Sequence, residues 1–250
     1  MRLFFMSIHF KIKLAPAIAT AIVLPILMTL GFWQLDRAEI KQHALNTYKA
    51  RTEQAAIKLS PNDKPASINL DELQYASLEV TGHYDTKHSF LIDNRVHQQQ
   101  VGFYVVTPFL VENSNTVILV NRGWIKAKRY RTELPDFSTN NQKLSLKGVA
   151  YSPSKNFFAV ENVKIESQAF PLIIQNIDFL AISEVLGKDI YPFLLLLDPK
   201  DKTGFIREWK VITSSPEKSQ SYAVQWFTMA FVVFIIFLSS CTTFKRENAA

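Results

Sequence analysis

The chain has 250 residues and a single cysteine, Cys241, so no intramolecular disulfide and no site made of several cysteines can form. Glycine is scarce, with 7 residues, and the sequence contains no Gly-x-Ser-x-Gly, no His-Glu-x-x-His, no phosphate-binding glycine loop and no Cys-x-x-Cys. Because the common catalytic signatures are absent, we expect a protein that is not an enzyme. We also expect no dedicated metal-ion site.

A basic face of the kind that binds nucleic acid is also missing, although the formal net charge is +6. Residues 42–221 contain 21 lysines and arginines against 19 aspartates and glutamates, so the middle of the chain is nearly neutral. Most of the excess positive charge flanks two apolar runs near the chain ends. We therefore expect no nucleic acid partner, and we interpret the basic flanks as those of membrane helices.

Two long runs lack any charged residue. Residues 14–35 would span about 33 Å as a helix, which is enough for a bilayer core, and residues 222–240 form the second run. The sequence around Trp33 lacks the small residues of a signal-peptide cleavage site, which favours an uncleaved anchor. Two spans in a lipid bilayer place residues 1–13 and 241–250 on one side of the membrane and the middle of the chain on the other.

The middle of the chain divides by its pattern. Residues 36–65 start with helical spacing, which predicts a solvated stalk, and end in a linker with two prolines, while residues 214–221 form a second linker. Residues 66–213 follow period two, which predicts a domain of short strands. The expected strands, with one short helix at 178–186, are residues 76–84, 90–93, 101–111, 117–125, 143–151, 157–163, 170–175, 191–197 and 205–212. The sequence thus predicts a membrane protein in which two transmembrane helices flank a β-rich, barrel- or sandwich-like α+β domain.

The most apolar strand, at residues 117–120, is followed by the turn-forming sequence Asn-Arg-Gly at 121–123, which we expect to end it. An earlier strand leads into Asn94 and Arg95 in the same way. In an antiparallel meander these strands would run in the same direction, and Arg95 and Arg122 would leave the same end of the sheet roughly 9 to 10 Å apart. Such a pair could bind an anionic ligand. The alternative is that each arginine pairs with a nearby carboxylate.

The histidines give a weaker signal. His83 and His88 bracket a short expected turn and could meet as two metal or haem ligands. No third ligand stands at a suitable spacing, so two solvated histidines at strand ends are the alternative.

A basic cluster follows the most apolar strand. It could attract lipid headgroups or ligand carboxylates, or it could simply face water. Its members are Lys126, Lys128, Arg129 and Arg131.

Several short motifs along the chain together resemble a known family. They are Gly31-Phe32-Trp33-Gln34 with Arg37 at the end of the first apolar run, Gly82, Asn94-Arg95, Gly102, Asn121-Arg122-Gly123-Trp124, and Tyr222 with Gln225-Trp226 at the start of the last run. In this order they resemble the surfeit locus protein 1 family of cytochrome c oxidase assembly factors.

The resemblance implies a multi-pass protein of the bacterial inner membrane with its main domain in the periplasm. It implies a chaperone for the biogenesis of respiratory complex IV, which assists the delivery or insertion of haem a into subunit I of an aa3-type oxidase by binding and protein contacts. Subunit I and haem a synthase would be its partners. Haem a would be bound transiently, with Arg95 and Arg122 pairing with its propionates and His83 and His88 as further hypothetical contacts.

The sequence departs from the family pattern at one place. Family members commonly carry a histidine just before the last helix, whereas Pro216-Glu217-Lys218 is followed here by Ser219. Axial haem ligation from this position is impossible, so haem would be bound through other groups or not held tightly. The alternative function, from the residues alone, is a membrane-anchored binding module for a lipid or another small ligand.

Overall fold

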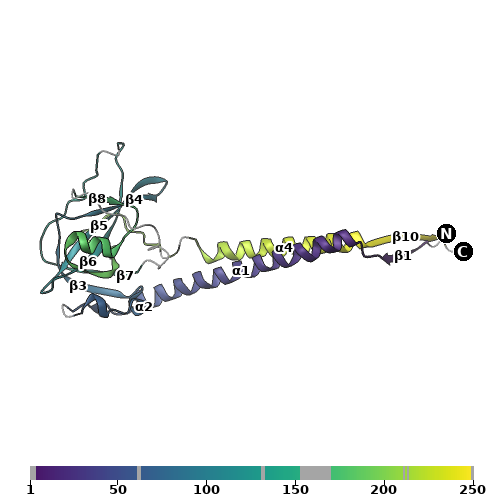
Figure 1. Cartoon of the computed structure of the whole chain (residues 1–250), viewed down its shortest axis with the longest axis horizontal. Coiled ribbons are helices and arrows are strands. Elements are labelled where there is room, and N and C mark those ends of the chain that lie inside the picture. Colours follow the sequence, from purple (N-terminus) through teal and green to yellow (C-terminus); the bar gives the residue numbers. More distant parts are fainter. Residues whose placement is uncertain are drawn as a thin grey trace. The chain divides into compact units, whose positions relative to one another are not determined.

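The computed structural model describes residues 4–60, 63–130, 133–152, 170–210, 212 and 214–248, and for residues 4–10 and 243–248 it describes the backbone alone. The chain forms two units. One contains the described residues up to Asn46 and those after Lys210, and the other contains the described residues of 47–210 (Figure 1). The first unit holds two long apolar helices, and the second is a β-rich domain.

The helices of the first unit are α1 (Leu14–Thr52), of which residues 47–52 belong to the second unit, and α4 (Pro216–Cys241). Both are long and apolar enough to cross a membrane, which supports the two predicted spans. α1 continues as a helix well beyond its apolar run, as far as Thr52. α4 starts six residues before its apolar run, and residues 216–221 are therefore helical where a linker was expected. Pro216 suits this start because the first helical position needs no N–H partner.

Small residues bring α1 and α4 close together. Gly31 is buried, and a Cβ atom there would lie 2.5 Å from the ring of Phe227. Phe32 meets the same ring edge to face, with 5.3 Å between the ring centroids. Ala38 and Ala223 are buried as well. Small side chains thus allow the two helix backbones to approach, as is common for helices in membranes.

Two strands near the ends of the chain, one before α1 and one after α4, pair as a ribbon. β1 (Phe4–Phe10) pairs antiparallel with β10 (Thr242–Asn248). These strands were not predicted, because the segments outside the apolar runs were interpreted only as short cytoplasmic ends.

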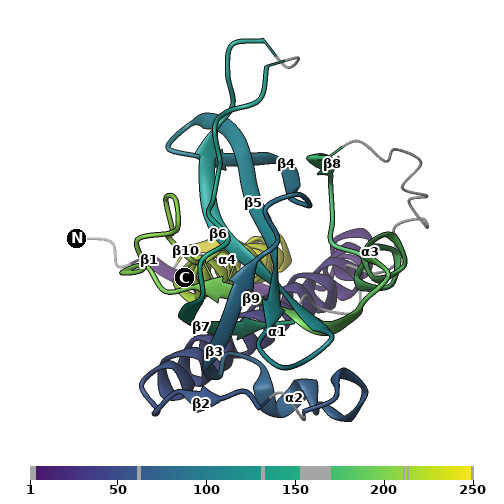
Figure 2. The same cartoon turned by 90° about the vertical axis from the view of Figure 1, so that its left-hand side faces the viewer.

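The β-rich domain is a closed barrel of five strands (Figure 2). In the order of their hydrogen bonding these are β3 (Ser77–Tyr84), β7 (Leu144–Tyr151), β9 (Asp189–Leu197), β6 (Thr116–Lys126) and β5 (Gln100–Val111). β5 also pairs with β3, which closes the ring. Beyond β5 the sheet continues with β4 (Phe90–His97) and β8 (Leu172–Ile174), and β2 (Ile57–Lys58) lies beside β3.

Gly82 makes the closure of the barrel possible. It pairs with Leu144 on β7 and with Val111 on β5. A Cβ atom at this position would lie 1.9 Å from the carbonyl oxygen of Leu110, so any side chain would push β3 and β5 apart. One buried cluster includes Tyr84, Phe109, Ile118, Tyr191 and Leu195, which are fully buried residues of the barrel strands.

The predicted short helix is confirmed as α3 (Phe179–Leu186). The Asp178 side chain caps its start by accepting hydrogen bonds from two backbone N–H groups, and Gly187 ends it with φ of 60°. α3 helps to enclose a second buried cluster with β8 and parts of β4, β5, β6 and β9. Two further short helices, η1 (Pro65–Ser67) and α2 (Leu70–Leu73), were missed because they are too short to show a period.

The expected strand at residues 205–212 was wrong. Its described residues make only an isolated bridge between Ile206 and Trp124, and the segment is otherwise irregular. Its period-two pattern arises because alternate side chains pack on the sheet, which does not require a strand. The expected strand at residues 157–163 lies outside the described residues.

Candidate functional site

The Asn-Arg-Gly-Trp sequence lies inside β6 and does not end it. Asn121 pairs with Val106 and Gly123 pairs with Val105, so Arg122 is the extra residue of a β-bulge. Gly123 has φ of 114°, and its N–H donates to Asn121 Oδ1 at 3.1 Å. The expectation that Asn-Arg-Gly stops the strand was wrong, because bulges and turns use the same residue types, whereas the expected range of 117–125 agrees with β6.

Arg122 is buried and donates its hydrogen bonds to backbone carbonyl groups. Its Nε and Nη2 reach the oxygen of Thr203 at 3.0 and 2.7 Å. Its Nη1 reaches the oxygen of Phe137 at 3.1 Å, and Nη2 also reaches that of Ser138 at 3.4 Å. Arg122 therefore ties two loops to β6.

Aromatic rings enclose the Arg122 guanidinium. Its central carbon lies 5.1 Å from the ring centroid of Tyr84 and 4.9 Å from that of Phe205, within the range of cation–π contacts. Burial lowers the pKa of Arg122 and raises the pKa of Tyr84. The carbonyl and ring contacts account for this arginine without a ligand, so the geometry gives no support to a propionate contact at Arg122.

Trp124 links the two Asn-Arg sequences. Its indole Nε1 donates to the carbonyl oxygen of Arg95 at 2.7 Å. To reach β4 the indole passes over Gly102 of β5, where a Cβ atom would lie 2.6 Å from the ring. The glycine and the tryptophan of the motifs thus position the backbone at Arg95.

The two arginines do not leave the same end of the sheet. The antiparallel meander of β4, β5 and β6 is confirmed, but Arg95 pairs with Gly102, which pairs with Lys126. Arg122 lies four residues before Lys126, roughly 13 Å along the strand. Of the rings beside Arg122, Tyr84 belongs to one hydrophobic cluster and Phe205 packs on another, whereas Tyr104, near Arg95, packs on a third. The prediction was wrong because it placed both arginines at strand ends, whereas both strands continue.

Arg95 keeps one buried hydrogen-bond donor that has no partner in the part of the chain that the structure describes. Its Nη2 donates to the carbonyl oxygen of Gln175 at 3.0 Å, but its buried Nε has no hydrogen-bond partner among the described residues. Burial raises the pKa of Tyr104 and of Tyr151. The positive charge of Arg95 offsets part of this increase in both residues, so the guanidinium lies near both phenols. A buried donor left unpaired costs about 1 to 3 kcal/mol, so a carboxylate acceptor fits here.

His97 lies two residues after Arg95, at the end of β4. Its ring packs on that of Trp124, with 5.1 Å between the centroids, and its Nδ1 lies 3.9 Å from Glu208 Oε2. The side chain is 16% exposed. This separation is too long for a hydrogen bond, so Glu208 acts on the ring only through its negative charge.

The two histidines predicted as haem contacts have other surroundings. His88 Nδ1 lies 2.7 Å from Asp85 Oδ2, and Asp85 also accepts from two backbone N–H groups of the turn. His83 lies on β3 opposite Leu110. In the described part of the chain no group of three or more histidine, cysteine or acidic side chains could hold a metal ion. The geometry gives these two histidines no support as a ligand pair.

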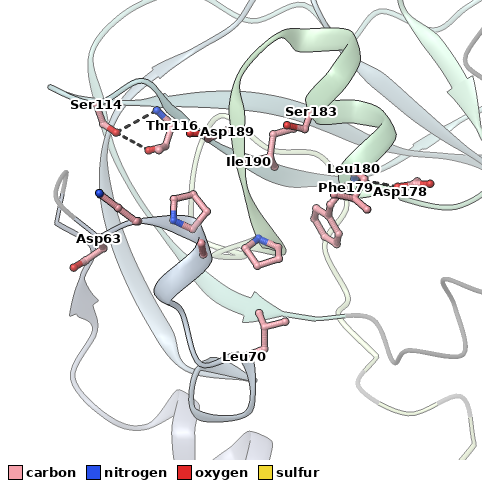
Figure 3. Close-up of a pocket in the computed structure, with 14 residues that line it drawn as sticks. Asp63, Leu70, Ser114, Thr116, Asp178, Phe179, Leu180, Ser183, Asp189 and Ile190 are labelled. Carbon is pink, nitrogen blue, oxygen red and sulfur yellow. Dashed lines mark hydrogen bonds between the residues drawn. The ribbon is translucent and has the colours of Figure 1, made fainter.

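A hollow of about 890 Å³ opens beside α3 and the start of β9 (Figure 3). Three aspartates line it, Asp63, Asp178 and Asp189, against one lysine, Lys64. Asp178 caps α3, and Asp63 Oδ2 accepts from the N–H of Ser60. This acidic lining is unfavourable for a ligand that carries carboxylates. The arginine and histidine candidates are not among the lining residues.

The basic cluster after β6 faces solvent in its described part. Lys126, Lys128 and Arg129 are exposed, and Arg129 lies over the ring of Tyr130 at 5.8 Å. Arg131 lies outside the described residues.

In the helical unit, the side chain of Lys41 lies beside Ser219. Its Nζ donates to Ser219 Oγ at 2.7 Å and to Ser214 Oγ at 2.8 Å, and Ser219 is buried. The helix residues named with the motifs differ in exposure: Trp33, Arg37, Tyr222 and Gln225 are exposed, whereas Gln34 and Trp226 are half-buried.

The sequence reasoning missed His97, Tyr104 and Glu208. His97 was overlooked because the strand was expected to stop at Asp93, whereas a register shift between Ile92 and Arg95 lets β4 continue to His97. The signal that could have found it is the alternation of Arg95 and His97, which places both side chains on one face of a strand.

Comparison with known proteins points to one family. Residues 21–231 match the model of the SURF1 family. A SURF1-like protein of Rickettsia bellii is 28% identical over 221 residues, which is 85% of each chain, and one of Rickettsia felis is 30% identical over 87% of this chain and 92% of the relative. The surfeit locus protein 1 of Arabidopsis thaliana is 31% identical over 38% of this chain and 29% of its own length.

Proposed function

The chain belongs to the SURF1 family, whose members are assembly factors for cytochrome c oxidase, and from this premise we propose that it assists the delivery of haem a to subunit I of an aa3-type oxidase. It binds haem a transiently, receives it from haem a synthase and contacts subunit I. It acts by binding and by protein contacts and catalyses no reaction.

The observation that carries the haem-binding part is the donor set of Arg95. The buried Nε has no acceptor among the described residues, and the backbone at Arg95 is fixed by Trp124. Haem a supplies carboxylates and an iron that accepts an axial ligand. A guanidinium with unpaired donors suits a carboxylate, because arginine binds it at two points.

The proposed location is the bacterial inner membrane, with the barrel domain in the periplasm and both chain ends in the cytoplasm. Two apolar helices and relatives from Rickettsia support this location.

Deletion of the gene tests the function. We expect a large loss of haem a per molecule of subunit I in isolated membranes, restored by the wild-type chain and by a Lys128→Ala variant, since Lys128 is exposed. Haem a content would be measured by pyridine haemochrome spectra and subunit I by immunoblot. Unchanged haem a content would contradict the proposal and favour a membrane-anchored binding module for a lipid or another small ligand.

A further inference from the structure

Arg95 and His97 present two different ligand-binding groups on one face of β4. They pair with Gly102 and Gln100 of β5, and residues two apart on a strand point to the same side. Their backbones are separated by roughly 7 Å along the strand. A guanidinium and an imidazole at this separation can contact one ligand that carries both an acidic group and a metal.

The surroundings of His97 favour binding through Nε2. The nearest carboxylate oxygen, Glu208 Oε2, lies 3.9 Å from Nδ1, so its negative charge favours the tautomer with the proton on Nδ1. The indole of Trp124 packs on the ring and restricts its rotation. The His97 side chain is partly exposed, so a ligand can reach the ring without local unfolding.

Aromatic side chains continue the same face beyond the arginine. Tyr104 is two residues from Gly102 on β5, and its ring lies 6.0 Å from that of Trp209. Both are half-buried and pack on the hydrophobic cluster that includes residues of β8 and α3. The face therefore offers two aromatic rings, tilted by 44° to each other, beside two polar groups, and aromatic rings can pack against a large planar ligand.

An iron porphyrin needs only one protein ligand. The described residues contain no cluster of three metal-binding side chains, which disfavours a bare metal ion. Four positions on the iron are already filled by the porphyrin, so a single imidazole completes the contact. His88 also has a carboxylate at Nδ1, but it lies before β4, outside the strand that carries Arg95, and its ring packs edge to face on Phe170.

We propose that His97 Nε2 is the axial ligand to the iron of a bound haem and that Arg95 binds a propionate of the same molecule. The inference rests on the proposed haem-carrier function and names the residues of its site. The imidazole lone pair replaces a water or another weak ligand on the iron, without any change of oxidation state. This chain would thereby bind haem on its barrel domain, although Ser219 provides no ligand in the helical unit.

Titration of the purified full-length chain in detergent with ferric haem tests the assignment. We expect the wild-type spectrum to show an imidazole-bound iron. His97→Ala should weaken binding by about tenfold or more and abolish this signature, because the iron–imidazole bond is lost. Added free imidazole should restore the retention of haem by His97→Ala on gel filtration, an effect that a merely structural role of His97 would not produce; the spectrum alone does not suffice, because imidazole also binds free ferric haem. Arg95→Ala should weaken binding by about tenfold while leaving the signature unchanged.

His88→Ala is the matched control and should behave as wild type. His97→Gln, together with a melting curve, covers the case in which alanine disturbs the packing on Trp124. An unchanged signature in both His97 variants would overturn the assignment but leave the haem-carrier function intact. Failure of the wild-type chain to bind ferric haem would overturn both. Loss of the signature in His88→Ala or His83→Ala instead would assign the ligand to that histidine and overturn the assignment to His97.

Discussion

Replacement of Arg122 by methionine should lower the free energy of unfolding by about 3 kcal/mol or more, since charge-assisted hydrogen bonds are lost and buried carbonyl groups are left without donors. The carbonyl of Thr203 loses two donors, and those of Phe137 and Ser138 lose one each. Methionine approximately preserves the length of the side chain, so loss of volume contributes little. Chemical unfolding of the full chain in detergent, followed by far-UV circular dichroism, measures the difference.

Lys128→Met serves as the control for Arg122, because it removes a positive charge from an exposed position nearby in the sequence. It should change the free energy of unfolding by less than about 0.5 kcal/mol. If the two variants were equally stable, the buried role of Arg122 would be refuted, and its role as a ligand contact would have to be reconsidered.

Trp124→Ala should cost about 3 to 5 kcal/mol, because Trp124 is a buried aromatic side chain. Trp124→Phe separates packing from hydrogen bonding. It keeps a ring over Gly102 but removes the indole N–H that binds Arg95 O, which is worth about 1 kcal/mol. The same unfolding measurement applies to both variants.

The phenylalanine variant also connects the fold to the site. Trp124 contacts both the backbone of Arg95 and the ring of His97. Trp124→Phe should therefore weaken ferric haem binding by more than its small change in the free energy of unfolding explains. Trp33→Phe, at an exposed position of α1, is the matched control and should leave both stability and haem binding unchanged. Equal haem binding by Trp124→Phe and wild type would show that Trp124 does not position the site.

Period-two patterning predicted most of the barrel, because its strands alternate between the core and the outer face. β3 shows this most clearly, with every second residue from Leu78 to Tyr84 buried. The closure of the barrel was not predictable, since it depends on the close approach of β3 and β5 at Gly82, and a lone glycine in a strand does not reveal which neighbour it admits. The pairing order of strands far apart in sequence has no local signal.

One physical ambiguity explains the errors at the candidate site. Both Asn-Arg sequences resemble turns, and both lie in bulges of strands that continue. Asn94 has φ of 57° and Gly123 has φ of 114°, conformations that turns and bulges share. Because both sequences were interpreted as strand ends, Arg95 and Arg122 were expected to leave the same end of the sheet. In the structure one arginine is buried against carbonyl groups, and the other stands beside a histidine that was not considered.

The most direct test is the absorption spectrum of the full-length protein purified in detergent from cells that make haem a. The proposed function predicts a reproducible Soret band, diminished in Arg95→Ala and His97→Ala. A colourless protein that still copurifies with oxidase subunit I would contradict the carrier role and leave a chaperone that acts through protein contacts alone.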